Sequence, residues 1–122
     1  MGRILLAEDD DSVRAFVRRA LEMDGHDVVE ACDGAEAAEI LVGDARFDLI
    51  LSDIQMPVMD GIALALTVAR DHAGIPLVLM TGYAHQRERA HGLDEIVCDV
   101  VQKPFTLAEI RERVALALKA AA

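Results

Sequence analysis

The chain has 122 residues, enough for one hydrophobic core and too few for two. Hydrophobic residues make up 53% and charged residues 28%, with only 8 Gly and 3 Pro, which excludes collagen-like, low-complexity and disordered classes. The formal net charge of −10 repels phosphate backbones and anionic lipid, so we expect no direct nucleic-acid partner. With neither a signal peptide nor an apolar run of roughly 18 residues, we expect a cytoplasmic protein without membrane insertion.

Short apolar runs alternate with longer helical patterns along the chain. The strand candidates are residues 4–7, 27–31, 47–52, 76–81 and 97–102. The first, third and fourth are apolar without alternation, as is typical of parallel strands buried on both faces. We predict an α/β fold, a flavodoxin-like three-layer sandwich in which five helices cover a five-stranded parallel sheet. By analogy with doubly wound folds, its strand order is 2-1-3-4-5.

Helical periodicity and end signals define the first and third helices. Apolar residues recur at helical spacing over 13–21, which predicts a core-facing stripe, and Gly25 is placed to end that helix. Asp60 and Gly61 introduce a third helix over 62–70.

Capping signals open two of the other helices. Asp33 with Glu36, and Thr106 with Glu109, resemble capping boxes for the second and last helices. A more polar helix is expected over 84–92, between the fourth and fifth strands.

Two pairs of apolar side chains need a separate interpretation. Leu64 and Val68 fall off the main apolar face that we assign to the third helix, which consists of Ile62, Ala65, Leu66 and Ala69. They either form an exposed surface or pack under a neighbouring loop. Cys32 and Cys98 lack the spacing of a zinc site or a disulfide framework, and we interpret both as small buried hydrophobes.

Polar side chains follow four of the five strand candidates. Glu8 and Asp9 follow the first strand, Asp53 the third and Lys103 the fifth, and Thr81 ends the fourth. Neighbouring strands lie about 4.8 Å apart, so we expect these side chains in one crevice where the strand order reverses. Crowded carboxylates raise each other's pKa unless a cation intervenes. An all-oxygen acidic site of this kind suits Mg²⁺.

This combination of side chains suits phosphoryl transfer. An aspartate can act as the nucleophile, while a lysine and a hydroxyl stabilise the phosphoryl oxygens. Each residue alone has a plainer interpretation: the acidic run reads as a helix N-terminus, with Asp11 or Ser12 as the N-cap, and Lys103 as a solvated lysine. Because all these polar residues are predicted to lie in one crevice, we favour a functional site over the plainer interpretations.

Four stretches of the sequence resemble the signatures of response-regulator receiver domains. They are ILLAEDDDSVR, LILSDIQMPVMDG, VLMTGYA and VQKPF. The resemblance spans essentially the whole chain, and it implies a single receiver domain over residues 1–122 with no output domain.

The resemblance assigns roles to the acidic residues. It implies that Asp53 accepts a phosphoryl group from a histidine of a kinase or phosphotransfer protein. It also implies Mg²⁺ as cofactor, bound by Asp53, Asp9 and the backbone carbonyl of Gln55, and by Glu8 through water. Asp10 and Asp11 lie outside this set, and we keep the N-cap interpretation for both.

Further residues are assigned by the same resemblance. Thr81 and Lys103 are expected to contact the phosphoryl group, and the bond between Lys103 and Pro104 is expected to be cis. The family usually carries an aromatic switch residue where this chain has Val100. Tyr83 either substitutes for that aromatic or is an exposed loop residue.

The motifs together look most like the CpdR type of stand-alone receiver. That type acts, when unphosphorylated, as an adaptor for a ClpXP-type AAA+ protease, so we expect an adaptor in regulated proteolysis and not a turnover enzyme. The alternative within the family is a phosphate shuttle or sink between kinases. A flavodoxin-like cofactor carrier shares the fold, but four acids after the first strand would repel a flavin phosphate. A phosphatase with an aspartyl nucleophile is another alternative, but the common form has a second aspartate where this chain has Gln55, which disfavours that class.

Overall fold

The computed structural model describes residues 2–82, 92–93 and 95–121. Its strands are β1 (Arg3–Ala7), β2 (Asp27–Ala31), β3 (Leu49–Asp53), β4 (Leu77–Thr81) and β5 (Asp99–Gln102). Its helices are α1 (Asp11–Met23), α2 (Gly34–Gly43), α3 (Gly61–Asp71) and α5 (Leu107–Ala121). The helix expected over 84–92 lies, except for Gly92, outside the described residues, as does Tyr83.

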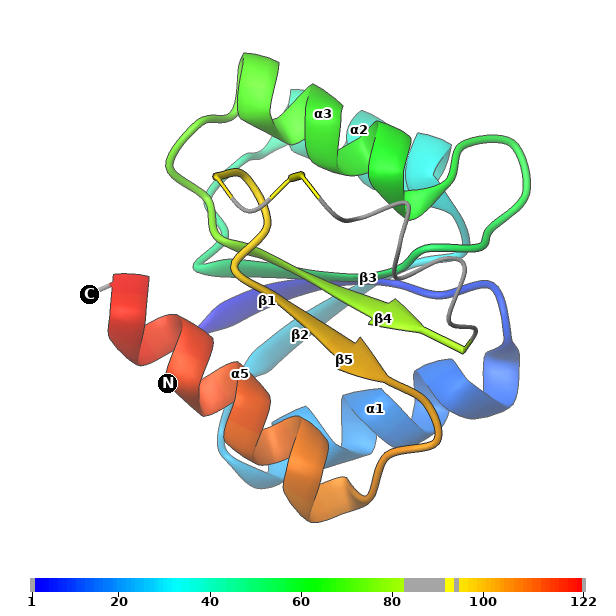
Figure 1. The fold of residues 1–122 in the computed structure, drawn as a ribbon, viewed down its shortest axis with the longest axis vertical. Coiled ribbons are helices and arrows are strands. Elements are labelled where there is room, and N and C mark those ends of the chain that lie inside the picture. The colour runs from blue at the N-terminus through cyan, green and yellow to red at the C-terminus, as the bar shows by residue number, and fades with distance from the viewer. Residues whose placement is uncertain (1, 83–91, 94, 122) are drawn as a thin grey trace.

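The strands form one parallel sheet in the order β2-β1-β3-β4-β5, which confirms the predicted topology. Helices α1 and α5 cover one face of this sheet, and α2 and α3 cover the other (Figure 1). Within the described part of the chain, no helix is long and apolar enough to cross a membrane.

The three central strands are buried on both faces, as their unbroken apolar runs predict. Alternate side chains of one strand belong to different cores: Leu5 packs with the α2 and α3 residues, whereas Ile4 and Leu6 pack with those of α1 and α5. Burial on both sides fixes the register of the strands, because a shift by one residue would exchange the two sets. The carboxyl ends of β1, β3 and β4 are therefore held in fixed positions.

The helix ends agree with most of the capping signals. Thr106 and Glu109 form the expected reciprocal box, with backbone-to-side-chain distances of 3.1 and 3.0 Å. Gly25 adopts a φ of 80° just beyond α1, as its predicted role requires. The N-cap of α1 is Asp10, which confirms the N-cap interpretation for this residue and not for Asp11 or Ser12. Asp10 has extended backbone, and its carboxylate accepts the amides of Ser12 and Val13.

Two interpretations of apolar residues are wrong. Leu64 and Val68 are 0% and 3% exposed and belong to the main core, whereas Leu66 is 52% exposed. The buried face of α3 is thus rotated from the one that the sequence pattern favoured. Cys32 and Cys98 are exposed because each lies in a connection next to a strand and not in a core-facing element.

The start of α2 is locked to the loop between β3 and α3. The amide of Gly34 donates to the carbonyl of Met59 at 3.0 Å, and a Cβ on Gly34 would lie only 2.4 Å from that same oxygen. Gly43, at the other end of α2, has nothing within 4 Å of the equivalent position. Only one of the two helix glycines is therefore required by packing.

We expect Gly34→Ala to lower the free energy of unfolding by about 1–3 kcal/mol, the usual cost of forcing extra atoms into a packed site. Gly43→Ala is the matched control, and we expect it to be neutral or stabilising by up to about 1 kcal/mol, because alanine is the better helix former. Urea unfolding followed by circular dichroism measures both values. Equal effects of the two substitutions would contradict the close approach at Gly34.

Candidate functional site

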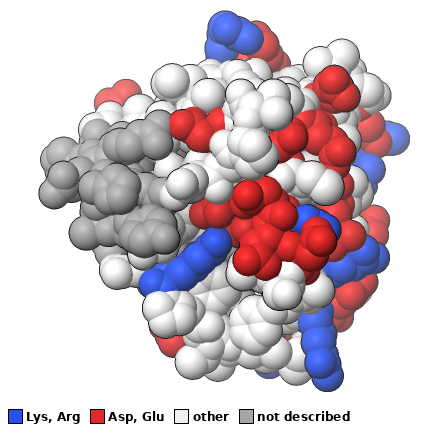
Figure 2. All heavy atoms as spheres, turned by 90° about the vertical axis from the view of Figure 1, so that its right-hand side faces the viewer, with Lys and Arg blue, Asp and Glu red and all other residues white. Residues whose placement is uncertain are grey.

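A hollow of about 840 Å³ opens at the carboxyl ends of the strands. Acidic side chains gather around it, with basic side chains at their edge (Figure 2). Its lining comes from the ends of β1, β3, β4 and β5 and from the first turns of α1. Apart from β1 and α1, which follow one another directly, these segments are far apart in sequence, and the sheet order brings them together.

Three carboxylates meet at this hollow. Glu8, Asp9 and Asp53 each place one oxygen within 4.8 Å of the others. The register explains the meeting, because Ala7 of β1 is paired with Ser52 of β3 and the acids come directly after these residues. Glu8 and Asp53 are buried, at 0% and 6% exposure, whereas Asp9 is exposed.

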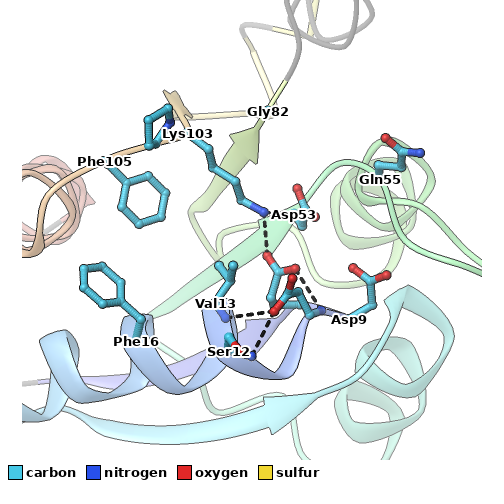
Figure 3. Close-up of a pocket in the computed structure, with 12 residues that line it drawn as sticks. Asp9, Ser12, Val13, Phe16, Asp53, Gln55, Gly82, Lys103 and Phe105 are labelled. Atoms are coloured by element: carbon cyan, nitrogen blue, oxygen red, sulfur yellow. Dashed lines mark hydrogen bonds and ion pairs between the residues drawn. The ribbon is translucent and has the colours of Figure 1, made fainter.

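Lys103 reaches across the sheet from the end of β5 to the two buried acids. Its Nζ lies 2.9 Å from Glu8 Oε2 and 3.2 Å from Asp53 Oδ2. Figure 3 shows this side chain pointing into the hollow toward the acidic residues. The ammonium therefore lies where the negative charge is most strongly desolvated.

One ammonium does not balance this cluster. Burial raises the pKa of the Glu8 carboxyl, and the hydrogen bond from Lys103 opposes that rise without cancelling it. Burial also raises the pKa of Asp53, with a further contribution from the charge of Asp9, against the lowering effect of Lys103. Burial lowers the pKa of Lys103, but the two carboxylates outweigh it and the net change is upward. The site thus has an excess of buried negative charge.

The donor set fits a hard divalent cation. All the clustered ligand atoms are carboxylate oxygens, which suit Mg²⁺, and a second cation would relieve the repulsion that burial intensifies. Glu8, Asp9 and Asp53 would hold such an ion. Gln55, exposed after β3, also lines the hollow and is the remaining ligand expected from the sequence.

The backbone after β3 holds the Asp53 side chain through the oxygen that does not contact Lys103. Its Oδ1 accepts the amide of Ile54 at 2.9 Å, and the Ser52 hydroxyl donates to the Asp53 carbonyl at 2.9 Å. Gly61 donates to the Ile54 carbonyl at 2.8 Å, and a Cβ there would lie 2.2 Å from the Asp53 carbonyl. Backbone contacts thus leave Oδ2 of Asp53 directed at Lys103.

The other predicted residues are placed as follows. Thr81 ends β4, is fully buried and is paired in register with Gln102, one residue before Lys103. The bond between Lys103 and Pro104 is cis, as expected. Val100 is partly buried against the core, and it provides no aromatic ring in β5.

An apolar part of the site was not predicted. Phe16 and Phe105 line the hollow together with Val13, and the two ring centroids are 6.3 Å apart. Phe16 was assigned to the core stripe of the first helix, yet it is 39% exposed. Phe105 directly follows the Lys-Pro pair, and this adjacency is the one sequence signal that could have placed it here (Figure 3).

Comparisons with known proteins identify the family. A family model described as the response regulator receiver domain matches residues 4–115, so the chain belongs to that family. The response regulator MprA of Mycobacterium ulcerans is 35% identical over 117 residues, covering 96% of this chain and 50% of the relative. This chain therefore spans about half the length of the curated relatives it matches.

Solved structures agree with the family model. The receiver domain of the Francisella response regulator 1452 is 28% identical, with a TM-score of 0.87 and full coverage of both chains. The chemotaxis response regulator CheY4 of Vibrio cholerae is also 28% identical, with a TM-score of 0.84 over 96% of this chain and 98% of that one. The sequence prediction of a receiver domain is confirmed, and membership of this family favours a receiver over a flavodoxin-like cofactor carrier.

The raised pKa of Asp53 predicts a stability that depends on pH. Without Mg²⁺, we expect Asp53→Asn to raise the free energy of unfolding by about 1 kcal/mol at neutral pH, because it removes one of the crowded buried negative charges. A gain of this size is typical of substitutions that remove an unfavourable interaction at a functional site. A carboxyl whose pKa is raised by folding stabilises the fold fully below its ordinary pKa of 3.8, and that contribution is lost as the pH rises through the folded value. The difference between variant and wild type should therefore vanish toward acid pH. Urea titrations at a series of pH values measure it.

Asp24→Asn is the matched control with the opposite sign. The hydrogen bond from Arg111 lowers the pKa of Asp24, so its contribution exists above the ordinary value of 3.8 and is lost as the pH falls. We expect a small loss of stability at neutral pH, because this pair is partly exposed and screened by solvent. A loss of stability in Asp53→Asn as well would contradict the excess of buried charge.

Proposed function

We propose that this chain is the receiver of a response regulator and that it is phosphorylated on Asp53 with Mg²⁺ as cofactor. The observation that carries the proposal is the Asp53 carboxylate, which is buried among acids and has one oxygen at 3.2 Å from the Lys103 ammonium. A nucleophile beside a fixed cation and a metal-binding acid cluster is the set that phosphoryl transfer needs.

In the proposed step, a carboxylate oxygen of Asp53 attacks the phosphorus of a phosphohistidine on the donor. The new P–O bond forms as the P–N bond breaks, and the electron pair leaves with the imidazole nitrogen, which takes up a proton. Bound Mg²⁺ would neutralise charge on the phosphoryl oxygens. Lys103 would stabilise the same oxygens as a point charge, and the backbone contacts of Asp53 keep its carboxylate in place.

Phosphorylation would change the partners of Lys103 and Thr81. Lys103 holds Glu8 and Asp53 before transfer, and the new phosphoryl oxygens would compete for its ammonium. Thr81 lies at the end of β4, next to the strand that carries Lys103, and we assign its hydroxyl to the phosphoryl group. The loop after β4 would report the change to a partner.

A protein donor fits the surface around the acids. Phe16, Phe105 and Val13 form an apolar wall of the hollow beside Asp53. A partly exposed aromatic pair can pack against a partner helix that presents its histidine to the site. We therefore propose a histidine kinase or phosphotransfer protein as the donor.

For the output, we propose an adaptor role in ClpXP-type regulated proteolysis. This finer proposal rests on the CpdR-like motifs and on Val100 at the usual aromatic position. A phosphate shuttle or sink would use the same pocket and is the competing function.

We expect the chain, incubated with Mg²⁺ and acetyl phosphate, to gain one phosphoryl group that hydroxylamine removes, as an acyl phosphate requires. Asp53→Asn should gain none. Asp60→Asn is the matched control: Asp60 caps α3 in the same loop, and asparagine caps equally well. Intact-mass spectrometry makes the comparison, and labelling of Asp53→Asn at the wild-type level would overturn the proposal.

The adaptor role predicts a state-dependent complex with a purified ClpXP-type unfoldase. We expect the unphosphorylated chain to bind and the form loaded with beryllofluoride and Mg²⁺ to bind at least about tenfold more weakly, a difference of about 1.4 kcal/mol. Fluorescence anisotropy of the labelled chain measures both. Absence of binding in both states, with rapid return of the phosphoryl group to a histidine phosphotransfer protein, would support the shuttle instead.

A further inference from the structure

We infer that Arg14 is a positioning residue that holds the β1–α1 loop in the shape in which Glu8 and Asp9 bind a divalent cation. The inference deepens the proposed function and rests on it. Arg14 belongs to the first turns of α1 and contacts the acidic loop through the Glu8 carbonyl, and it is not one of the clustered metal ligands.

The Arg14 guanidinium connects three segments. Its Nη1 donates to the backbone carbonyl of Glu8 at 2.8 Å, its Nη2 lies 2.5 Å from Asp11 Oδ1, and its Nε lies 3.7 Å from Glu30 Oε1. The side chain is only 16% exposed, so these contacts are partly protected from solvent. One side chain thus ties the acidic loop to the start of α1 and to β2.

The carbonyl that Arg14 holds belongs to the peptide between Glu8 and Asp9. The Glu8 amide donates to the carbonyl of Ala31 in β2 at 3.1 Å, and the Glu8 carboxylate accepts the Asp10 amide at 3.1 Å. These bonds hold the residues on either side of the Glu8–Asp9 peptide, and the bond from Arg14 to the Glu8 carbonyl fixes the orientation of the peptide itself. The direction in which the exposed Asp9 side chain leaves the backbone depends on that orientation.

Charge and positioning predict opposite effects of removing Arg14. A guanidinium near the acidic cluster repels a divalent cation, so charge alone predicts tighter Mg²⁺ binding after its removal. Loss of the contact with the Glu8 carbonyl predicts weaker Mg²⁺ binding, because part of the binding free energy must then be used to order the loop. The sign of the change therefore separates the two explanations.

Arg18 offers a matched control on the same helix, one turn further on. It pairs with Glu30 at 2.8 Å and with Glu22 at 3.4 Å. Arg18→Gln removes the same charge and one ion pair to Glu30, but it leaves the contact between Arg14 and the Glu8 carbonyl in place.

Calorimetric titration of the metal-free chain with MgCl₂ tests the inference. We expect Arg14→Gln to weaken Mg²⁺ binding about tenfold, the lower end of the range for residues that orient metal ligands. Arg14→Lys should recover part of this loss, since it keeps a cationic donor without the fork of the guanidinium. Arg18→Gln should bind within about twofold of wild type, because an exposed ion pair contributes little.

A second measurement needs no metal. Amide hydrogen exchange over residues 8–11 should be faster in Arg14→Gln than in wild type and unchanged in Arg18→Gln. If Arg14→Gln does not fold, Arg14→Lys makes the same comparison. We expect it to weaken Mg²⁺ binding about threefold, a value intermediate between the wild type and the tenfold loss expected for Arg14→Gln.

The outcomes separate the inference from the proposed function. Mg²⁺ binding by Arg14→Gln that is equal to or tighter than wild type overturns the positioning role and leaves the proposed function intact. Absence of Mg²⁺ binding by the wild type overturns both.

Discussion

The charge imbalance at the carboxyl edge of the sheet is the constraint from which the properties of the site follow. Three carboxylates share a small space with one ammonium, and two of the carboxylates are buried. Desolvation makes such a cluster costly unless each charge is paired. The fold tolerates it because both sheet faces are packed elsewhere, so the site is a local weakness in an otherwise well-buried core.

The sheet imposes this crowding through its topology. The order β2-β1-β3-β4-β5 places the ends of β1 and β3 side by side at the reversal point, so acids that follow both strands must meet. Two glycines then let backbone approach backbone where a side chain would collide: Gly61 lies against the Asp53 carbonyl and Gly34 against that of Met59. Main-chain contacts hold Asp53, the proposed phosphoacceptor, at the end of β3, and they leave one of its carboxylate oxygens directed at Lys103.

Sequence patterns predicted the strands and the polar residues at their ends because these depend on short-range rules, whereas the strand order came from analogy with doubly wound folds. Unbroken apolar runs specify buried parallel strands, and polar residues directly after them must lie at one edge. The errors arose where tertiary packing decides. The buried face of α3 depends on how the helix is rotated against the sheet, and periodicity wrongly placed Leu66 inside and Leu64 outside. Phe16 has the spacing of the core-facing residues of α1, yet its side chain lines the hollow of the site. The contact of Arg14 with a backbone carbonyl has no sequence signature, since any arginine near an acidic run would look the same.

The same charge imbalance explains how such a site can act as a switch. Lys103 is shared between Glu8 and Asp53, so its ammonium supplies part of the positive charge that a divalent cation would bring to the cluster. Binding of a divalent cation would weaken the hold of Glu8 on Lys103, and conversion of Asp53 to an acyl phosphate would move negative charge from the carboxylate outward to the phosphoryl oxygens. Lys103 would follow that charge, because a partly buried ammonium is more stable beside its counter-charge. Under the proposed function, the signal would then be the relocation of one cation at the end of β5, adjacent to the strand that ends in Thr81.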